Sequence, residues 1–141
     1  MSGDVNKILR VYLGAQASLT AIVGSRIYCP RLPEGATLPA LAFFVRGGIS
    51  NPYTRALVSP SFQLDCWGQN PIEARSLYQA LYDVFQGIGG YYNASIPVVV
   101  GATTYYILSA QEEVQGQDLQ EIDPPNYHRV LSFFKIQMQI L

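Results

Sequence analysis

The stretch that most constrains the fold is FQLDCWGQNPIEARSLYQALYDVF, residues 62–85, because its hydrophobic period changes from two to about 3.6 within a few residues. Phe62, Leu64 and Cys66 alternate with the residues between them, as in a strand with one buried face, so we expect Cys66 to point into the core. From Ala74 onward the apolar residues recur at helical spacing. The stretch therefore predicts a strand that turns directly into a long helix.

Three residues mark the helix start: Asn70 is a good cap, Pro71 suits the first turn, and Glu73 lies three residues after the cap. We expect the lone tryptophan, Trp67, to cover this helix start or to fill an interface rather than to bind a ligand. The expected apolar stripe consists of Ala74, Leu77, Tyr78, Leu81, Phe85 and Ile88, and Gly87, Gly89 and Gly90 are expected to end the helix.

The N-terminal part of the chain predicts two helices followed by strands. A first helix over residues 5–12 is capped by Asp4, and a shorter one over residues 19–23 is capped by Ser18. The following segments predict a short strand at 27–28, an ordered proline-rich loop at 29–39, a strand at 40–47, and a long hairpin arm at 48–59 that returns to a strand beginning near residue 61.

The last third of the chain predicts strands separated by one acidic loop. Residues 92–100 and 103–112 read as a hairpin, and residues 127–141 alternate as a long closing strand. Between them, residues 113–126 hold four acids, two prolines and no Lys or Arg, so we expect an exposed acidic loop.

The order of helices and strands predicts the fold class. It favours an α+β fold: a mainly antiparallel sheet with two main helices packed on one face, plus an extended hairpin arm. We expect residues 1–141 to form a single domain, long enough to bury about 70% of its unfolded surface without metals or disulfides.

The composition favours a protein that binds copies of itself or a partner over one that binds nucleic acid or membranes. Only 13% of the residues are charged, against about 25% in an average soluble domain, so we expect part of the surface to be buried against copies of the chain or a partner. The formal net charge of −1 gives no global field that would attract nucleic acid or acidic lipid. The apolar runs are too short to span a bilayer, and we expect no membrane association.

Catalytic and metal sites have little support in the sequence. The single histidine, His128, has no nucleophile signature near it, and Cys29 and Cys66 lack a CxxC spacing, which favours reduced thiols over a disulfide. Glu112 and Glu113, like Glu121 and Asp123, read as solvated carboxylates rather than an acid–base pair. We expect no enzyme, no cofactor and no metal.

Three segments, in their order, carry a family resemblance: RIYCPRLPEGATLPALAFFVRGG (residues 26–48), the opening stretch, and YHRVLSFFKIQ (residues 127–137). Following an N-terminal helix, they resemble the tail-completion family of long-tailed bacteriophages, which is related to the tail terminators. The resemblance covers nearly the whole chain, from Ile8 to Gln137.

The resemblance implies a structural role without catalytic residues. Members of the tail-completion family form a ring, expected to be of six subunits, at the head-proximal end of the tail. There they stop tail-tube growth and join the tail to the head. The implied partners are further copies of the chain, the tail tube protein and head–tail connector proteins, while DNA passes through the channel without specific binding. The implied location is the head–tail junction of the virion, with the host cytoplasm as the place of assembly.

Candidate interface residues follow from this role. We expect the 48–59 arm, with Tyr53 and Arg55, to reach a neighbouring subunit or ring, and Trp67 to contribute to a contact. The acidic residues Glu113, Asp118, Glu121 and Asp123 are expected near the channel or the head-facing surface. Two alternatives remain open: a head-completion or adaptor connector, and a small-ligand-binding α+β domain with Tyr and Trp around a pocket at the strand-to-helix joint.

Overall fold

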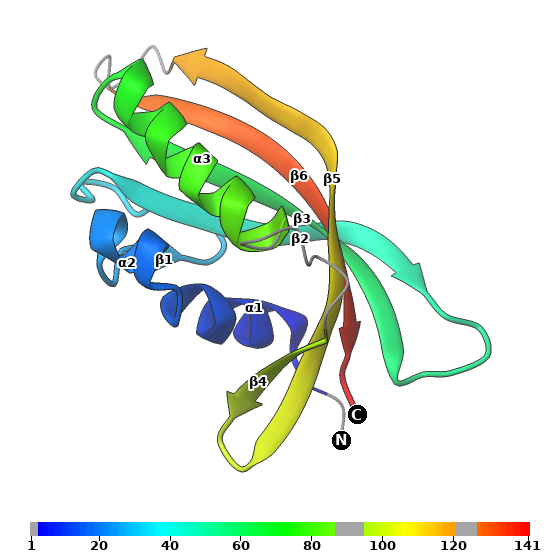
Figure 1. Cartoon of the computed structure of the whole chain (residues 1–141). Coiled ribbons are helices and arrows are strands. Elements are labelled where there is room, and N and C mark those ends of the chain that lie inside the picture. Colours follow the sequence, from blue (N-terminus) through cyan, green and yellow to red (C-terminus); the bar gives the residue numbers. More distant parts are fainter. Residues whose placement is uncertain (1–2, 87–94, 121–126) are drawn as a thin grey trace.

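The computed structural model describes residues 3–86, 95–120 and 127–141. A curled six-stranded sheet, in the order β1-β2-β3-β6-β5-β4, carries three helices, which confirms the α+β prediction (Figure 1). The elements are α1 (Val5–Gly14), α2 (Ala17–Val23), β1 (Ile27–Tyr28), β2 (Ala40–Ser50), β3 (Leu57–Gly68), α3 (Pro71–Gln86), β4 (Ile96–Val100), β5 (Thr103–Gln120) and β6 (His128–Gln139).

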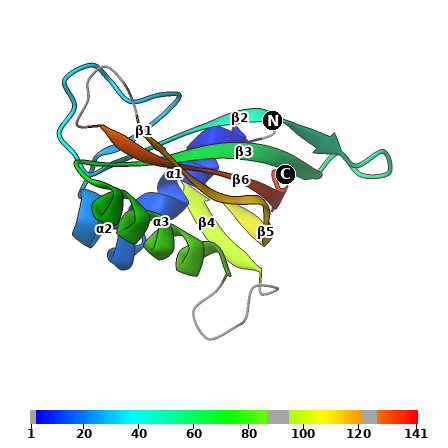
Figure 2. The same cartoon turned by 90° about the horizontal axis from the view of Figure 1, so that it is seen from above.

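The sheet is antiparallel except for one edge, where the short β1 pairs in parallel with β2. The β2–β3 ribbon begins where Ala40 faces Trp67 and continues until Ser50 faces Val58. One end of this ribbon therefore lies beside the β3–α3 joint and the 29–39 loop, whereas the other end extends as a free arm. Both views show the loop and the arm at opposite ends of the ribbon (Figures 1 and 2).

The core lies between the helices and one face of the sheet, as the hydrophobic periods predict. β6 alternates between buried and half-buried residues, which places Phe134, Ile136 and Met138 in the core. Cys66 is fully buried on the same face of the sheet, as predicted. The helices cover the core with Ile8, Leu9, Tyr12 and Leu13 of α1, Leu19 and Val23 of α2, and Ala74, Leu77, Tyr78, Leu81, Val84 and Phe85 of α3.

The predicted start of α3 is confirmed in detail. The Asn70 side-chain oxygen accepts a hydrogen bond from the Glu73 backbone N–H at 2.8 Å, and the Glu73 carboxylate accepts one from the Gln69 N–H at 3.4 Å. Gly68 ends β3 so close to the helix that a Cβ there would lie 2.6 Å from the Ala74 nitrogen. The strand can turn directly into the helix only because this position has no side chain.

The acidic-loop prediction is wrong for residues 113–120, which belong to β5. This strand pairs with β6 as far as Gln120 opposite His128, with register shifts after Ile107, Glu112 and Val114. Pairing with β6 supplies the backbone hydrogen bonds that a solvated loop would have taken from water. The remaining residues of the expected loop, 121–126, lie outside the described residues.

Smaller differences concern element ends. α2 begins at Ala17 after Gln16, which forms no side-chain cap bond, so Ser18 lies inside the helix rather than capping it. β3 begins at Leu57 rather than near residue 61, and β2 continues to Ser50, because the arm itself is a paired hairpin. Three further expectations fall within residues 87–94, outside the described residues: Ile88 in the helix stripe, the helix end at Gly87, Gly89 and Gly90, and the start of the 92–100 strand.

Candidate functional site

The arm is a regular hairpin that projects from the body of the molecule (Figure 1). Its two strands come together at Gly48, where a Cβ would lie 2.5 Å from the Ser59 carbonyl oxygen and where φ is +136°. A residue with a side chain would be strained here and would push the strands apart. The sequence thus allows the ribbon to remain paired as it leaves the sheet.

The arm tip is held by hydrogen bonds within the tip itself. The Asn51 side-chain oxygen accepts hydrogen bonds from the backbone N–H groups of Tyr53 at 2.8 Å and Thr54 at 3.3 Å, and the Leu57 N–H donates to the Thr54 carbonyl at 3.4 Å. Tyr53 is 96% exposed and Ile49 is 67% exposed, although both are apolar or aromatic. Arg55 is exposed at the same tip. The arm therefore presents an ordered aromatic and cationic surface to solvent.

Trp67 lies at the opposite end of the ribbon and packs against its own chain. Its ring contacts the Tyr127 ring edge-on at 6.1 Å, and the Arg129 guanidinium lies 5.3 Å from the ring centroid. Arg129 also forms an ion pair with Asp65, at 3.6 Å. The indole N–H is buried and has no hydrogen-bond acceptor among the described residues. Trp67 thus belongs to a half-buried aromatic cluster beside the 29–39 loop.

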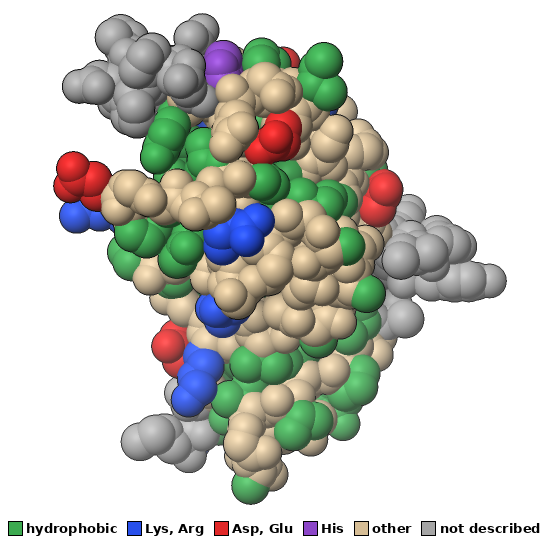
Figure 3. Space-filling model, turned by 90° about the vertical axis from the view of Figure 1, so that its left-hand side faces the viewer, with side chains coloured by type: hydrophobic (Ala, Val, Ile, Leu, Met, Phe, Trp, Pro, Cys, Tyr) green, Lys and Arg blue, Asp and Glu red, His purple; other side chains and the backbone are tan. Residues whose placement is uncertain are grey.

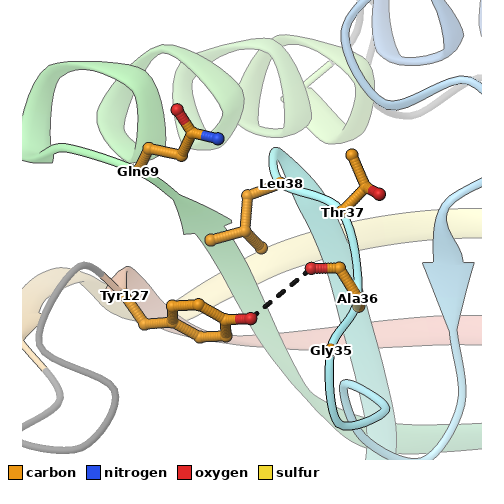
Figure 4. A pocket seen from close by; sticks show the side chains of 6 residues that line it. All are labelled: Gly35, Ala36, Thr37, Leu38, Gln69 and Tyr127. Carbon is orange, nitrogen blue, oxygen red and sulfur yellow. Dashed lines mark hydrogen bonds between the residues drawn. The ribbon is translucent and has the colours of Figure 1, made fainter.

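Two hollows flank this cluster. One, of about 440 Å³, lies between residues 31–35 of the loop and the sheet residues Phe44, Gln63, Asp65, Trp67 and Arg129. The other, of about 570 Å³, lies between residues 35–38 and Gln69 and is bordered by Tyr127, whose hydroxyl donates to the Ala36 carbonyl at 3.5 Å (Figure 4). Tyr127 and Gly35 line both hollows. The hollows lie beside the strand-to-helix joint where the ligand-binding alternative expects a pocket.

The acidic residues of β5 are paired rather than free. On one face, Glu113 accepts a hydrogen bond from Ser61 and lies 3.7 Å from Arg46. On the face toward α3, Asp118 forms an ion pair with Arg75 at 3.2 Å, and Glu112 accepts a hydrogen bond from the Tyr78 hydroxyl. Each carboxylate therefore fastens β5 to another element. Glu121 and Asp123 lie outside the described residues.

The hydroxyl of Tyr78, which donates to Glu112, has a shifted pKa. Burial, together with its hydrogen bond to Glu112, raises the pKa of the Tyr78 hydroxyl to about 12. The same hydroxyl accepts a hydrogen bond from the Gly116 N–H at 3.2 Å. Tyr78 thus remains protonated at neutral pH and joins α3 to an irregular part of β5.

The expected interface residues fall into separate regions instead of one site. Tyr53 and Arg55 lie at the arm tip, Trp67 lies near the other end of the β2–β3 ribbon, and Glu113 and Asp118 lie on opposite faces of β5. The sequence reasoning placed a pocket at the strand-to-helix joint only in its ligand-binding alternative, and it missed the contribution of the 31–35 loop to the hollow around Trp67. Two signals in the sequence could have indicated this contribution, namely the three prolines in residues 29–39 and the aromatic residue Tyr127 immediately before β6.

Cys66, which the sequence analysis weighed as a possible reactive thiol, is buried in the core. Burial raises the pKa of the Cys66 thiol well above its ordinary value, which disfavours the reactive thiolate. Both cysteines are free thiols, Cys29 exposed and Cys66 buried. Within residues 3–86, 95–120 and 127–141, no group of three or more His, Cys, Asp or Glu side chains is placed to hold a metal ion. No helix in these ranges is long and apolar enough to cross a membrane.

Comparison with known proteins gives a likeness in fold. No protein-family model matches the chain, and no curated protein matches its sequence. Its fold is similar to that of a chain in the virion of a native gene transfer agent (GTA) particle, with a TM-score of 0.60. The match covers 98% of this chain and 99% of that chain at 15% sequence identity, which establishes a shared fold.

Proposed function

We propose that the chain is a structural subunit of a phage-like virion. In this role it forms a ring, of six subunits, at the head-proximal end of the tail, stops tail-tube growth and joins the tail to the head. The observation that carries the proposal is the likeness, over nearly the full length of both chains, to a chain of the gene transfer agent virion. The resemblance of three sequence segments to the tail-completion family supports the more specific position at the junction.

The surface is consistent with a subunit of a larger assembly. Figure 3, which views the molecule from the end opposite the arm, shows Lys, Arg, Asp and Glu side chains scattered among apolar and uncharged atoms. The arm adds an exposed Tyr53 and Ile49 at the other end. A ring with cyclic symmetry needs two different patches on each subunit that meet head to tail. Sparse charge and exposed aromatic side chains are typical of such buried contacts.

The acidic residues have a second proposed role in this ring. We propose that the acidic segment of the sequence from Glu112 to Asp123 faces the channel or the head, where negative charge would keep passing DNA from adhering. The pairing of Glu113 with Arg46 and of Asp118 with Arg75 reduces the net charge of this region. Replacing the acids of this segment with their amides should slow DNA ejection, and normal ejection would contradict the role.

The position in the particle can be tested by immunogold labelling. An antibody raised against the purified chain should label purified particles at one point, between head and tail. Antibody against a different purified protein is the control for adventitious label. Label along the tail, on the head shell, or on no part of the particle would contradict the proposed position.

A second candidate function has one structural observation in its favour, the hollows beside Trp67 and Tyr127. A small-molecule site there should raise the melting temperature when its ligand binds. A thermal-shift screen of metabolites tests this candidate. Stabilisation that is lost in the variant Tyr127→Ala would favour ligand binding, and the absence of any stabilising compound would leave the assembly role as the better account.

A further inference from the structure

We propose that the arm tip of one copy docks into the Trp67 hollow of the next copy, the hollow being the 440 Å³ space bounded by residues 31–35 and the sheet. This inference rests on the proposed ring and names the two surfaces that meet in it. Tyr53 is the aromatic anchor, and Arg55 is the charged residue that fixes its orientation.

The arm tip has the properties of a binding surface that is ordered before it binds. Its backbone is fixed by the Asn51 side chain and by the hydrogen bond from Leu57 to Thr54, so little conformational entropy remains to be lost on docking. Tyr53 is nevertheless 96% exposed. Tyrosine is among the residues that contribute most binding energy when they enter a partner's pocket. The tip is thus suited to insertion rather than to packing on its own chain.

The hollow has the size and lining that an aromatic side chain and a cation require. Its volume falls within the roughly 300–1,000 Å³ of ordinary binding pockets. Phe44, Trp67 and Tyr127 supply aromatic faces, while the loop side of the rim carries two exposed charged residues, Arg31 and Glu34. The other carboxylate, Asp65, is occupied by Arg129, which leaves Glu34 as the partner for Arg55. Residues 47–60 contain no acid, so the tip brings only positive charge to this rim.

The placement of the two surfaces favours contact between copies. They lie at opposite ends of the β2–β3 ribbon, so one copy's tip cannot fill its own hollow (Figures 1 and 2). Two different patches that fit each other on one chain produce a head-to-tail contact, which generates a closed ring when the rotation between copies closes. The arm and the hollow therefore supply the two patches that a ring of identical subunits needs.

Thiol crosslinking tests the contact directly. In a Cys29→Ser background, Pro52→Cys at the tip and Pro33→Cys at the hollow place one thiol on each surface, and Cys66 is fully buried. Producing cells carry this double variant, and a short bismaleimide is applied both to purified particles and to the concentrated protein. We expect a ladder of dimers, trimers and higher species. The control pairs Pro52→Cys with Val99→Cys, an exposed position on β4, and should give no ladder.

Charge exchange tests the orientation. Arg55→Glu, added to the crosslinking pair, should lower the ladder yield at least about tenfold, because it faces Glu34 with a like charge. Adding Glu34→Arg should restore the yield. Restoration of the ladder yield would show that the two residues meet directly. A yield lost because Arg55→Glu prevented folding would not return when Glu34 is replaced as well.

The results separate this inference from the proposed function. Particles that contain the chain but give no ladder, or a ladder equal to that of the Val99 control, would overturn the arm-to-hollow contact and leave the ring intact. Particles that lack the chain would overturn the proposed function, and the ladder from concentrated protein would then decide the contact alone.

Discussion

At the scale of single residues, Tyr78 joins α3 to β5 through its hydroxyl and its ring. Its hydroxyl donates to Glu112 and accepts from the Gly116 N–H at 3.2 Å, while Arg75 lies 5.2 Å from the centre of its ring. Gly116 lies so close to Tyr78 that a Cβ there would be within 2.8 Å of the ring. α3 is thereby joined to the part of β5 where the register shifts.

Tyr78 should make the free energy of unfolding decrease as the pH rises into the alkaline range. Because its pKa is raised from 10.0 to about 12, its contribution is fully present below pH 10 and is lost as the pH rises toward 12. Tyr78→Phe should lower the free energy of unfolding at pH 8 and flatten its fall between pH 10 and 12. Tyr12, whose pKa is also raised by burial, should leave a residual slope.

Urea unfolding at a series of pH values checks this prediction. Tyr53→Phe is the matched control because it removes a hydroxyl from the exposed arm tip. A Tyr78→Phe profile parallel to the wild-type profile between pH 10 and 12 would show that Tyr78 does not cause the loss.

Two glycine-to-alanine changes should have opposite effects. At Gly68 the added methyl group would lie 2.6 Å from the Ala74 backbone nitrogen, so Gly68→Ala should destabilise the fold by about 1–3 kcal/mol. At Gly14, the last residue of α1, the nearest atom is the end of the Arg10 side chain at 3.8 Å. Gly14→Ala should therefore stabilise by about 0.5–1 kcal/mol. Urea unfolding measures both, and equal effects would contradict the close packing of β3 on α3.

At the scale of elements, sequence patterns predicted what is fixed locally. The Asn70 cap, the α3 stripe from Ala74 to Phe85 and the alternation of β6 depend on residues a few positions apart, and each was confirmed. The second half of β5 could not be read in this way. Its sequence is polar and contains Gly116, and it is held as a strand by distant partners: β6, Ser61 and Arg46 on one face, and Tyr78 and Arg75 on the other.

The same distinction applies to the candidate site. The arm could be predicted because its length and glycines are visible in one segment. The lining of the Trp67 hollow could not be predicted beyond Tyr and Trp at the strand-to-helix joint, because it is assembled from the 31–35 loop, β2, β3, β6 and the residue before β6, which lie far apart in the sequence. Trp67 was expected at the helix start or in an interface; it packs on Tyr127, and its place in an interface stays a prediction.

The arm should contribute to assembly and hardly at all to folding. Tyr53→Ala with Arg55→Ala removes only exposed side chains, so the melting temperature should change by no more than about 2 °C. Incorporation into particles, measured by quantitative immunoblotting, should fall at least about tenfold if Tyr53 is an anchor. Ser76→Ala with Gln79→Ala, on the exposed face of α3, is the control. Equal incorporation of both double variants would contradict a role for the arm.

At the scale of the whole molecule, the account depends on a fold that leaves two different surfaces at its two ends. The helices bury one face of the sheet, and the ribbon extends beyond the core to carry the arm away from the body (Figure 2). A chain built in this way, with only 13% charged residues, is suited to repeated contact with copies of itself. We propose the ring as the assembly that uses both ends.

The most direct test of the ring's role is electron microscopy of particles from producing cells whose gene for this chain carries an early stop codon. The account predicts over-long or headless tails beside DNA-filled heads without tails, and restoration of whole particles by the intact gene. Tails of normal length beside emptied heads would assign the chain to head completion instead. Normal, infectious particles would contradict a structural role at the head–tail junction.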